Sequence, residues 1–276
     1  MKRKILLPTD FSDNAWNAII YALKLFKHEF CTFYLLNSTF IQISTLSYFS
    51  NKLLKSIEQD ALKSLMDLEE LAESTNANCN HDFQIILSQE NLNTALKKAI
   101  LEWDIDLVIM GTKGATGARE VFFGSNTIHV INNLKNCPVL IVPETYDFLV
   151  PVQIAFPTDY NRFYSDKELR PIKLLADLYD AKIRIMHINA EENLNDIQEY
   201  NLNKLKQYLD HYDYSFHWMP KYGNKEMEIN DFIRELDINI LAMVNYKHNF
   251  MEKITHEPVI KKIGYHCKIP FMVIPE

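Results

Sequence analysis

An internal repeat constrains the fold of this chain more than any other feature of its 276 residues. The run Ile5–Phe11, ILLPTDF, recurs as Ile154–Tyr160, IAFPTDY. A repeat of this length is far longer than the unit of a solenoid and indicates two copies of one domain. We therefore predict domains at 1–145 and 150–276, with a linker at Thr145–Val150. Two further pairs of runs match in the same order, Asp104–Met110 with Asp237–Met243 and Pro138–Glu144 with Pro270–Glu276.

Hydrophobic patterning within the first copy predicts the fold class of that domain. Short apolar runs alternate with segments whose apolar residues recur at helical spacing. Alternating strands and helices predict an α/β fold in which a parallel sheet carries helices on both faces. Strands are expected at 4–7, 32–36, 83–87, 107–110 and 139–142, and helices at 15–26, 53–72, 92–103 and from Ser125 onward.

Residues Phe40–Asn51 interrupt this alternation and have almost no counterpart in the second copy. The segment is rich in serine, threonine and aromatic residues and is more apolar than a solvated loop requires. Two interpretations stay open: the segment folds over the core of its own domain, or it forms a surface for a partner.

Composition and charge exclude several classes of function. Nucleic-acid-binding surfaces need clustered lysine and arginine, whereas this chain has a net charge of -7. Pro8 and Asp10 come too early for a signal-peptide core, and no apolar run approaches the roughly 20 residues that span a bilayer. We therefore expect a cytoplasmic protein that binds neither nucleic acid nor membrane. The four cysteines form no Cys-x-x-Cys pair, so neither a zinc site nor a disulfide framework is indicated.

The stretch Asp106–Asn133 carries the strongest functional signal. Its pattern predicts a buried strand, a loop and a helix, and it holds four of the six glycines of the chain. Gly111 and Gly114 permit positive φ and close approach of the backbone to a ligand. Gly124 and Ser125 stand where the first amides of a helix are unpaired and its dipole attracts anions. A phosphate therefore fits this place.

The spacing of these glycines differs from that of the common phosphate loops. It lacks the Gly-x4-Gly-Lys-Ser/Thr of a Walker A loop, and the Gly-x-Gly-x-x-Gly fingerprint of a dinucleotide site does not occur. The alternative interpretation is a flexible loop in which the glycines only allow the backbone to turn. The agreement of spacing, preceding strand and following helix favours phosphate binding instead.

The pattern Gly-x2-Gly-x9-Gly-Ser resembles the nucleotide-phosphate loop of the ATP-binding universal stress proteins. The runs Ile5–Ser12, Met110–Gly114 and Cys137–Pro143 look like the same family, and the repeat looks like its two-domain form. The resemblance implies two tandem open parallel five-stranded sheets of order 3-2-1-4-5, adenine nucleotide alpha hydrolase-like. The strand order reverses between strands 1 and 4, and ligands of open α/β sheets bind at the carboxyl ends of strands at such a reversal.

The resemblance also implies the ligand and its contacts. The ligand would be ATP, with or without Mg²⁺; adenine and ribose would lie beside Pro8, Thr9 and Asp10, and Ser38 would close the base side. For Asp10, a helix-capping or turn carboxylate is the alternative interpretation. The phosphates would be surrounded by Gly111, Gly114, Gly124, Ser125 and Asn126.

Catalysis has much less support in the residues than binding has. Phosphoryl transfer needs a placed nucleophile, a metal with its carboxylates and stabilised charge at the γ-phosphate, and only the phosphate cradle is visible. Lys113 and Arg119 could supply charge to phosphates or simply be solvated. The nine histidines show no metal-ligand spacing, so we expect no metal site in the protein itself.

We therefore expect a nucleotide-dependent regulatory or stress-response module that is not an enzyme, with at most slow, incidental ATP hydrolysis. The alternative is a nucleotide-independent interaction scaffold in which the inherited loop is empty. The protein partner is unknown in either case.

The second copy is expected to be degenerate and to bind no nucleotide. Aligning the copies places Val244 at the position of Gly111 and Lys247 at that of Gly114, so both glycines are lost. Glu257 stands near the start of the following helix, where its charge would repel a phosphate.

The last strand of each copy carries a prediction about assembly. Val139–Val142 and Phe271–Ile274 are strongly β-forming and would be edge strands with unpaired amides. Related stress proteins dimerise through this strand, so we predict that the two domains pair with each other as an intramolecular pseudo-dimer. Homo-oligomerisation beyond that is left open.

Overall fold

The computed structural model describes residues 2–40, 51–76, 78–112, 124–189, 193–220, 225–245 and 268–276. The chain divides into two compact units at the boundary between Glu144 and Thr145. Unit 1 denotes the described residues before this boundary and unit 2 those after it.

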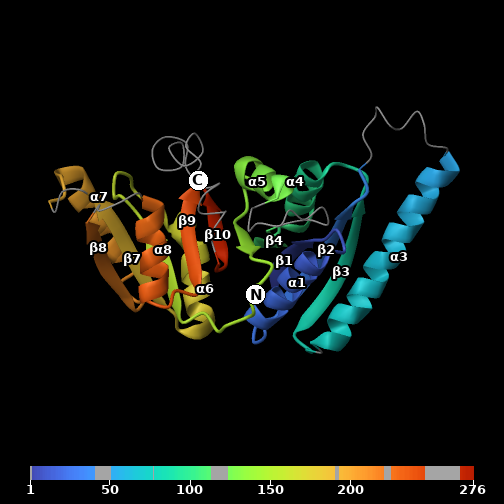
Figure 1. Cartoon of the computed structure of the whole chain (residues 1–276), viewed down its shortest axis with the longest axis horizontal. Helices are drawn as coiled ribbons and strands as arrows, with labels where there is room; N and C mark the ends of the chain where they lie inside the picture. Colours follow the sequence, from blue (N-terminus) through green and yellow to red (C-terminus); the bar gives the residue numbers. More distant parts are fainter. Residues whose placement is uncertain are drawn as a thin grey trace. The chain divides into compact units, whose positions relative to one another are not determined.

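Unit 1 is an open parallel sheet with helices packed on it (Figure 1). The strand order is β3-β2-β1-β4-β5, and every neighbouring pair in it is parallel. The predicted fold class is therefore confirmed for this unit. Its elements are β1 (Arg3–Pro8), α1 (Asp13–Leu25), β2 (Cys31–Ser38), α3 (Asn51–Thr75), β3 (His81–Ser88), α4 (Leu92–Trp103), β4 (Leu107–Gly111), α5 (Ser125–Asn133) and β5 (Val139–Val142).

Right-handed crossovers distribute the helices over the two faces of this sheet. The connections β1–α1–β2 and β2–α3–β3 run in one direction along the sheet, and β3–α4–β4 and β4–α5–β5 run in the other. Consequently α1 and α3 cover one face, and α4 and α5, which contact each other, cover the opposite face. Strands β4 and β5 are buried along their whole length, which explains why they are continuous apolar runs rather than alternating ones.

Unit 2 has the same architecture. Its strand order is β8-β7-β6-β9-β10, again 3-2-1-4-5, with parallel neighbours throughout. Its elements are β6 (Gln153–Pro157), α6 (Asp166–Tyr179), β7 (Lys182–Asn189), α7 (Asp196–Tyr208), β8 (Tyr214–Pro220), α8 (Lys225–Glu235), β9 (Ile240–Asn245) and β10 (Phe271–Pro275).

The bend after the first strand recurs in both units. Phe11 has a φ of 64° and its counterpart Tyr160 a φ of 54°, a left-handed conformation that bulky side chains seldom adopt. In each unit the bend is held by a threonine hydroxyl. The Phe11 amide donates to Thr9 Oγ1 at 3.0 Å, and the Tyr160 amide donates to Thr158 Oγ1 at 3.2 Å.

The entry to the fourth strand recurs as well. Asp104 and Asp237 both end a helix or its turn with a φ of 49°. Two residues later, a side chain reaches across to the first strand of its unit. Asp106 Oδ2 accepts from the Lys4 amide, and Asn239 Oδ1 accepts from the amide of Gln153, each at 2.9 Å. The same local geometry thus accompanies the same sequence pattern in both units.

The predicted elements of the first copy agree closely with the structure. Helix α4 and strand β5 have the predicted bounds, and the other elements differ from prediction mainly by a few residues at their ends. Residues 41–50 and 113–123 lie outside the described residues, so both interpretations of Phe40–Asn51 stay open. Among the described helices, none combines the length and apolar character needed to cross a membrane.

Candidate functional site

A cavity of about 310 Å³ lies at the carboxyl ends of β1, β2 and β4 in unit 1. The strand order reverses between β1 and β4, so the cavity occupies the place where open α/β sheets bind their ligands. The starts of α1, α4 and α5 complete its wall. Its lining residues are Pro8, Thr9, Asp10, Ala15, Asn37, Ser38, Phe40, Asn91, Leu92, Met110, Gly111, Asn126 and Thr127.

The cavity brings together six of the nine residues predicted to hold a nucleotide. Gly124 and Ser125 are not part of its lining, but they directly precede Asn126 at the start of α5. Gly114, Lys113 and Arg119 lie outside the described residues. The six lining residues are Pro8, Thr9, Asp10, Ser38, Gly111 and Asn126.

The start of α5 differs from the other helix starts at the cavity. Ser12 caps α1 by accepting from the Ala15 amide at 3.3 Å, and Asn91 caps α4 by accepting from the Thr94 amide at 3.1 Å. The N-cap of α5 is Gly124, which has no side chain to offer. Among the described residues, no side chain caps this helix, so its first amides can bind a ligand or water, and the helix dipole favours an anion there.

Hydrogen bonds hold the start of α5 at the end of β4. The Gly124 amide donates to the Thr112 carbonyl at 2.6 Å. The buried Thr127 hydroxyl lies 3.2 Å from the carbonyl oxygen of Gly111 and 3.1 Å from that of Thr112, to either of which it can donate. The uncapped turn is thus fixed beside the cavity on its β4 side.

Asp10 forms a turn and also lines the cavity. Its Oδ1 accepts from the Ser12 amide at 3.2 Å and from the Ser12 hydroxyl at 2.6 Å, which is the turn role considered as an alternative. The carboxylate nevertheless stays exposed at the cavity. The adjacent Thr9 carbonyl accepts from Asn37 Nδ2 at 2.8 Å, so the end of β2 supports the same bend.

Gly111 is required by a close packing contact rather than by a special backbone angle. No described glycine has a positive φ, so Gly111 does not use that freedom. A Cβ at this position would lie 2.6 Å from Asn14 Oδ1 and 2.9 Å from the Asn14 carbonyl oxygen. The first turn of α1 therefore occupies the space next to Gly111, and α1 can approach β4 only because the side chain is absent.

Ser38 is committed to a structural hydrogen bond. Its hydroxyl donates to the Glu90 carbonyl at 2.6 Å and so joins the end of β2 to the connection between β3 and α4. This bond brings Asn91 and Leu92 to the cavity, and sequence reasoning missed both residues. The available signal was the position of Asn91, which directly follows the β3–α4 connection and is a typical N-cap.

The described residues offer few groups for metal chemistry. No cluster of three or more histidine, cysteine, aspartate or glutamate side chains suited to a metal occurs among them. Asp10 is the acidic residue among those lining the cavity. What the lining does offer is hydrogen bonding from amides and hydroxyls, together with apolar contact from Phe40, Leu92 and Met110.

In unit 2, aromatic side chains fill the corresponding bend. Tyr160 is buried and stacks on His187 with ring centroids 4.6 Å apart, whereas its counterpart Phe11 is 41% exposed. Burial raises the pKa of Tyr160, so its phenol stays neutral. His187 Nδ1 contacts the Thr158 carbonyl at 2.9 Å, taking the role that Asn37 has in unit 1.

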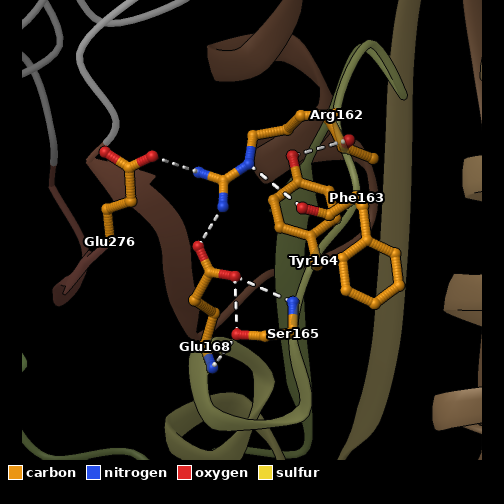
Figure 2. A network of polar contacts seen from close by, with 7 residues as sticks. Arg162, Phe163, Tyr164, Ser165, Glu168 and Glu276 are labelled. Atoms are coloured by element: carbon orange, nitrogen blue, oxygen red, sulfur yellow. Dashed lines mark hydrogen bonds and ion pairs between the residues drawn. The ribbon is translucent and has the colours of Figure 1, made fainter.

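Unit 2 also has an ion pair at the start of α6 (Figure 2). Ser165 caps α6 as Ser12 caps α1, so the buried Glu168 takes the position of the cavity-lining Ala15. Glu168 Oε1 accepts from Arg162 Nη2, and its Oε2 accepts from the Ser165 amide at 2.8 Å. Arg162 Nη1 lies 3.9 Å from a carboxylate oxygen of Glu276.

The strand register supports the alignment of Val244 with Gly111. Gly111 pairs with Val142 in β5, and Val244 pairs with Ile274 in β10, the matching positions of the two units. Lys247 and Glu257 lie outside the described residues. The absence of nucleotide binding in unit 2 stays a prediction. The buried ring of Tyr160 and the ion-paired Glu168 are additional reasons for it.

Comparisons with known proteins point to one family. The sequence profile described as the universal stress protein family matches residues 1–143. A universal stress protein of Methanocaldococcus jannaschii is 31% identical over 150 residues, which cover 51% of this chain and 81% of that protein.

Two solved structures share the fold at low sequence identity. A universal stress protein from Archaeoglobus fulgidus superposes with a TM-score of 0.70 at 14% identity, covering 99% of this chain and 96% of that one. A putative universal stress protein from Pseudomonas aeruginosa gives a TM-score of 0.60 at 11% identity, covering 99% and 93%.

Proposed function

The chain belongs to the universal stress protein family, and from this premise we propose that unit 1 binds ATP in the cavity at the ends of β1, β2 and β4. Family membership supports a role in the stress response. In the proposed role, the bound nucleotide biases the contacts that the chain makes with its partners.

The observation that carries the proposal is the uncapped start of α5 beside this cavity. A glycine N-cap supplies no side-chain acceptor for the first amides, and the helix dipole adds partial positive charge. A phosphate would satisfy both, as it does at many helix N-termini. The cavity then extends from this anion position across β1 to β2, which gives a nucleoside room to lie.

The lining favours binding over catalysis. Phosphoryl transfer requires a base or a positioned water, and usually a metal held by carboxylates. Asp10 already accepts two hydrogen bonds from Ser12, and no other acidic side chain occurs among the described residues that line the cavity. We therefore propose a regulatory module in which any hydrolysis of ATP is slow and incidental.

The nucleotide content of the purified protein separates this proposal from the alternative of an empty interaction scaffold. Perchloric acid extraction should release adenine nucleotide, and protein stripped of it should bind ATP in isothermal titration, with and without Mg²⁺. We expect one nucleotide per chain. Two equivalent sites per chain would contradict the assignment to unit 1, and an empty protein that does not bind ATP would favour the scaffold.

A substitution at the start of α5 tests the position of the phosphate. In the Ser125→Glu variant, the new carboxylate interacts well with the helix dipole but repels phosphate. We expect folding to be retained and ATP affinity to fall by about a hundredfold or more. Ser74→Glu, which adds the same charge at an exposed site on α3, is the matched control and should bind normally. Undiminished binding by Ser125→Glu would place the phosphate elsewhere.

A further inference from the structure

We propose that Asn91, the N-cap of α4, recognises the purine base of the bound nucleotide as a hydrogen-bond donor, and that the Ser38 hydroxyl oxygen is the acceptor beside it. This inference rests on the proposed function. It adds a residue that determines base specificity, on an element that does not belong to the glycine loop or to β1.

The two ends of the cavity differ in what they can bind. The uncapped turn of α5 lies on the β4 side, so the phosphates belong there. Strand β2 lies on the other side of β1, two strand spacings or about 10 Å from β4. A nucleoside whose phosphates sit at α5 therefore places its base near Ser38 and Asn91, which line that end of the cavity.

The side-chain amide of Asn91 has a fixed orientation. Its Oδ1 accepts from the Thr94 amide at 3.1 Å and contacts Thr94 Oγ1 at 3.2 Å, so the oxygen is committed to capping α4. The Nδ2 group therefore points away from the helix start. Within the described part of the chain it has no protein acceptor, and the residue is exposed at the cavity. Asn91 thus offers the ligand donors only.

The Ser38 hydroxyl has no hydrogen left to donate to a ligand. A hydroxyl carries one hydrogen, and Ser38 donates it to the Glu90 carbonyl at 2.6 Å. The remaining lone pairs of Ser38 Oγ can only accept. Because Glu90 directly precedes Asn91, this same bond holds the acceptor and the donor close together at the end of β2.

The connection that carries Asn91 is firmly held. The Thr39 amide donates to the Ser88 carbonyl at 2.8 Å, and the Glu90 amide donates to Ser88 Oγ at 3.2 Å. The side chain of Glu90 also forms an ion pair with Lys98 of α4 at 2.5 Å. The donor and acceptor are therefore positioned before the ligand arrives, which lowers the entropy cost of binding.

One donor beside one acceptor complements adenine. The edge of adenine that carries the exocyclic amine presents that amine as a donor and a ring nitrogen as an acceptor. The amine would donate to Ser38 Oγ, and the ring nitrogen would accept from Asn91 Nδ2. Phe40 and Leu92, which line the same end, offer apolar contact for the faces of the ring.

The test removes the amide donor at Nδ2 and keeps the helix cap. The serine hydroxyl that replaces it is shorter, so its O–H should not reach the ring nitrogen of the base. Serine is as good an N-cap as asparagine, and Asn91→Ser changes no charge, so folding and the field at the phosphates should be unaffected. We expect ATP affinity in isothermal titration to fall about tenfold. Asn195→Ser is the matched control: Asn195 caps α7 in unit 2 by accepting from the Gln198 amide at 3.0 Å, and its loss should leave ATP binding unchanged.

A ligand-side deletion tests the acceptor without altering the protein. Purine riboside triphosphate lacks the exocyclic amine, so the wild-type chain should bind it about tenfold more weakly than ATP. If the wild-type chain binds ATP while Asn91→Ser binds it equally well, or if purine riboside triphosphate binds as tightly as ATP, the inference is overturned and the proposed function stands. If the wild-type chain binds no ATP at all, both fail.

Discussion

At the scale of single residues, the contact between Gly111 and Asn14 sets the packing beneath the cavity. A methyl group at position 111 would meet both the side chain and the backbone carbonyl of Asn14 at less than 3.0 Å. Because the backbone cannot rotate away, Gly111→Ala should force α1 and β4 apart. We expect the free energy of unfolding to fall by about 1–3 kcal/mol, measured by urea denaturation.

A double variant localises the cause of that loss. Combining Gly111→Ala with Asn14→Ala removes the clash with the side chain but keeps the clash with the carbonyl, so stability should be recovered in part. Full stability in Gly111→Ala alone would mean that α1 can shift at no cost, and that the glycine serves the ligand instead.

At the scale of elements, strand β3 makes unit 1 sensitive to acid through His81. Burial lowers the pKa of this histidine from its ordinary value of 6.5, and a hydrogen bond with the Phe26 carbonyl offsets part of the shift. The unfolded chain therefore binds a proton more readily than the folded one. Stability should be fully present above pH 6.5 and should decrease as the pH falls below it.

Replacing the histidine tests this dependence. His81→Gln should reduce the loss of thermal stability between pH 7 and pH 5 relative to the wild-type chain. Part of the loss should remain, because burial lowers the pKa of His217 in β8 in the same direction. An unchanged pH profile in His81→Gln would exclude β3 as a source of the acid sensitivity.

The helices at the cavity differ in how their first amides are capped. Helices α1 and α4 satisfy their first amides with Ser12 and Asn91, whereas α5 begins at a glycine. In unit 2 the corresponding first helix, α6, begins with a capping box, in which the Ser165 and Glu168 side chains each accept from the backbone amide of the other residue. The same element thus borders a cavity in one unit and an ion pair in the other. Glu168 takes the position of Ala15, and its partner Arg162 lies between the bend at Tyr160 and the cap at Ser165, where unit 1 has no intervening residue.

At the scale of the whole molecule, the predicted pairing of the two units through their last strands stays a prediction. Strands β5 and β10 each have one ladder partner within their own unit, β4 and β9. If each also pairs along its other edge, all of its amides should be protected from hydrogen exchange, rather than about half of them.

Hydrogen exchange measured by mass spectrometry on the intact chain tests this pairing. Peptides spanning Val139–Val142 and Phe271–Ile274 should exchange slowly at every protein concentration, since an intramolecular pair does not depend on concentration. Rapid exchange of about half of these amides would exclude it. Protection that disappears on dilution would indicate pairing between chains instead.

The sequence by itself determined the architecture of both units. Continuous apolar runs such as Val139–Val142 specify buried parallel strands, and helical spacing with a good N-cap specifies a helix such as Leu92–Trp103. These signals are local, because they depend on neighbouring residues and on a period. The repeat then extended the same assignment to unit 2. The strand order, and with it the carboxyl ends of strands 1 and 4 as the place for a ligand, came from the family resemblance.

Only the tertiary structure decided what the side chains at that place do. Asn91 reaches the cavity because Ser38, more than fifty residues earlier, binds the carbonyl that precedes it. Gly111 is constrained by Asn14, and the ring of Tyr160, in the bend after β6, stacks on that of His187 in β7. Such contacts join residues that are distant in the chain and have no period, so no pattern along the sequence records them. They form only when folding brings the ends of several strands together.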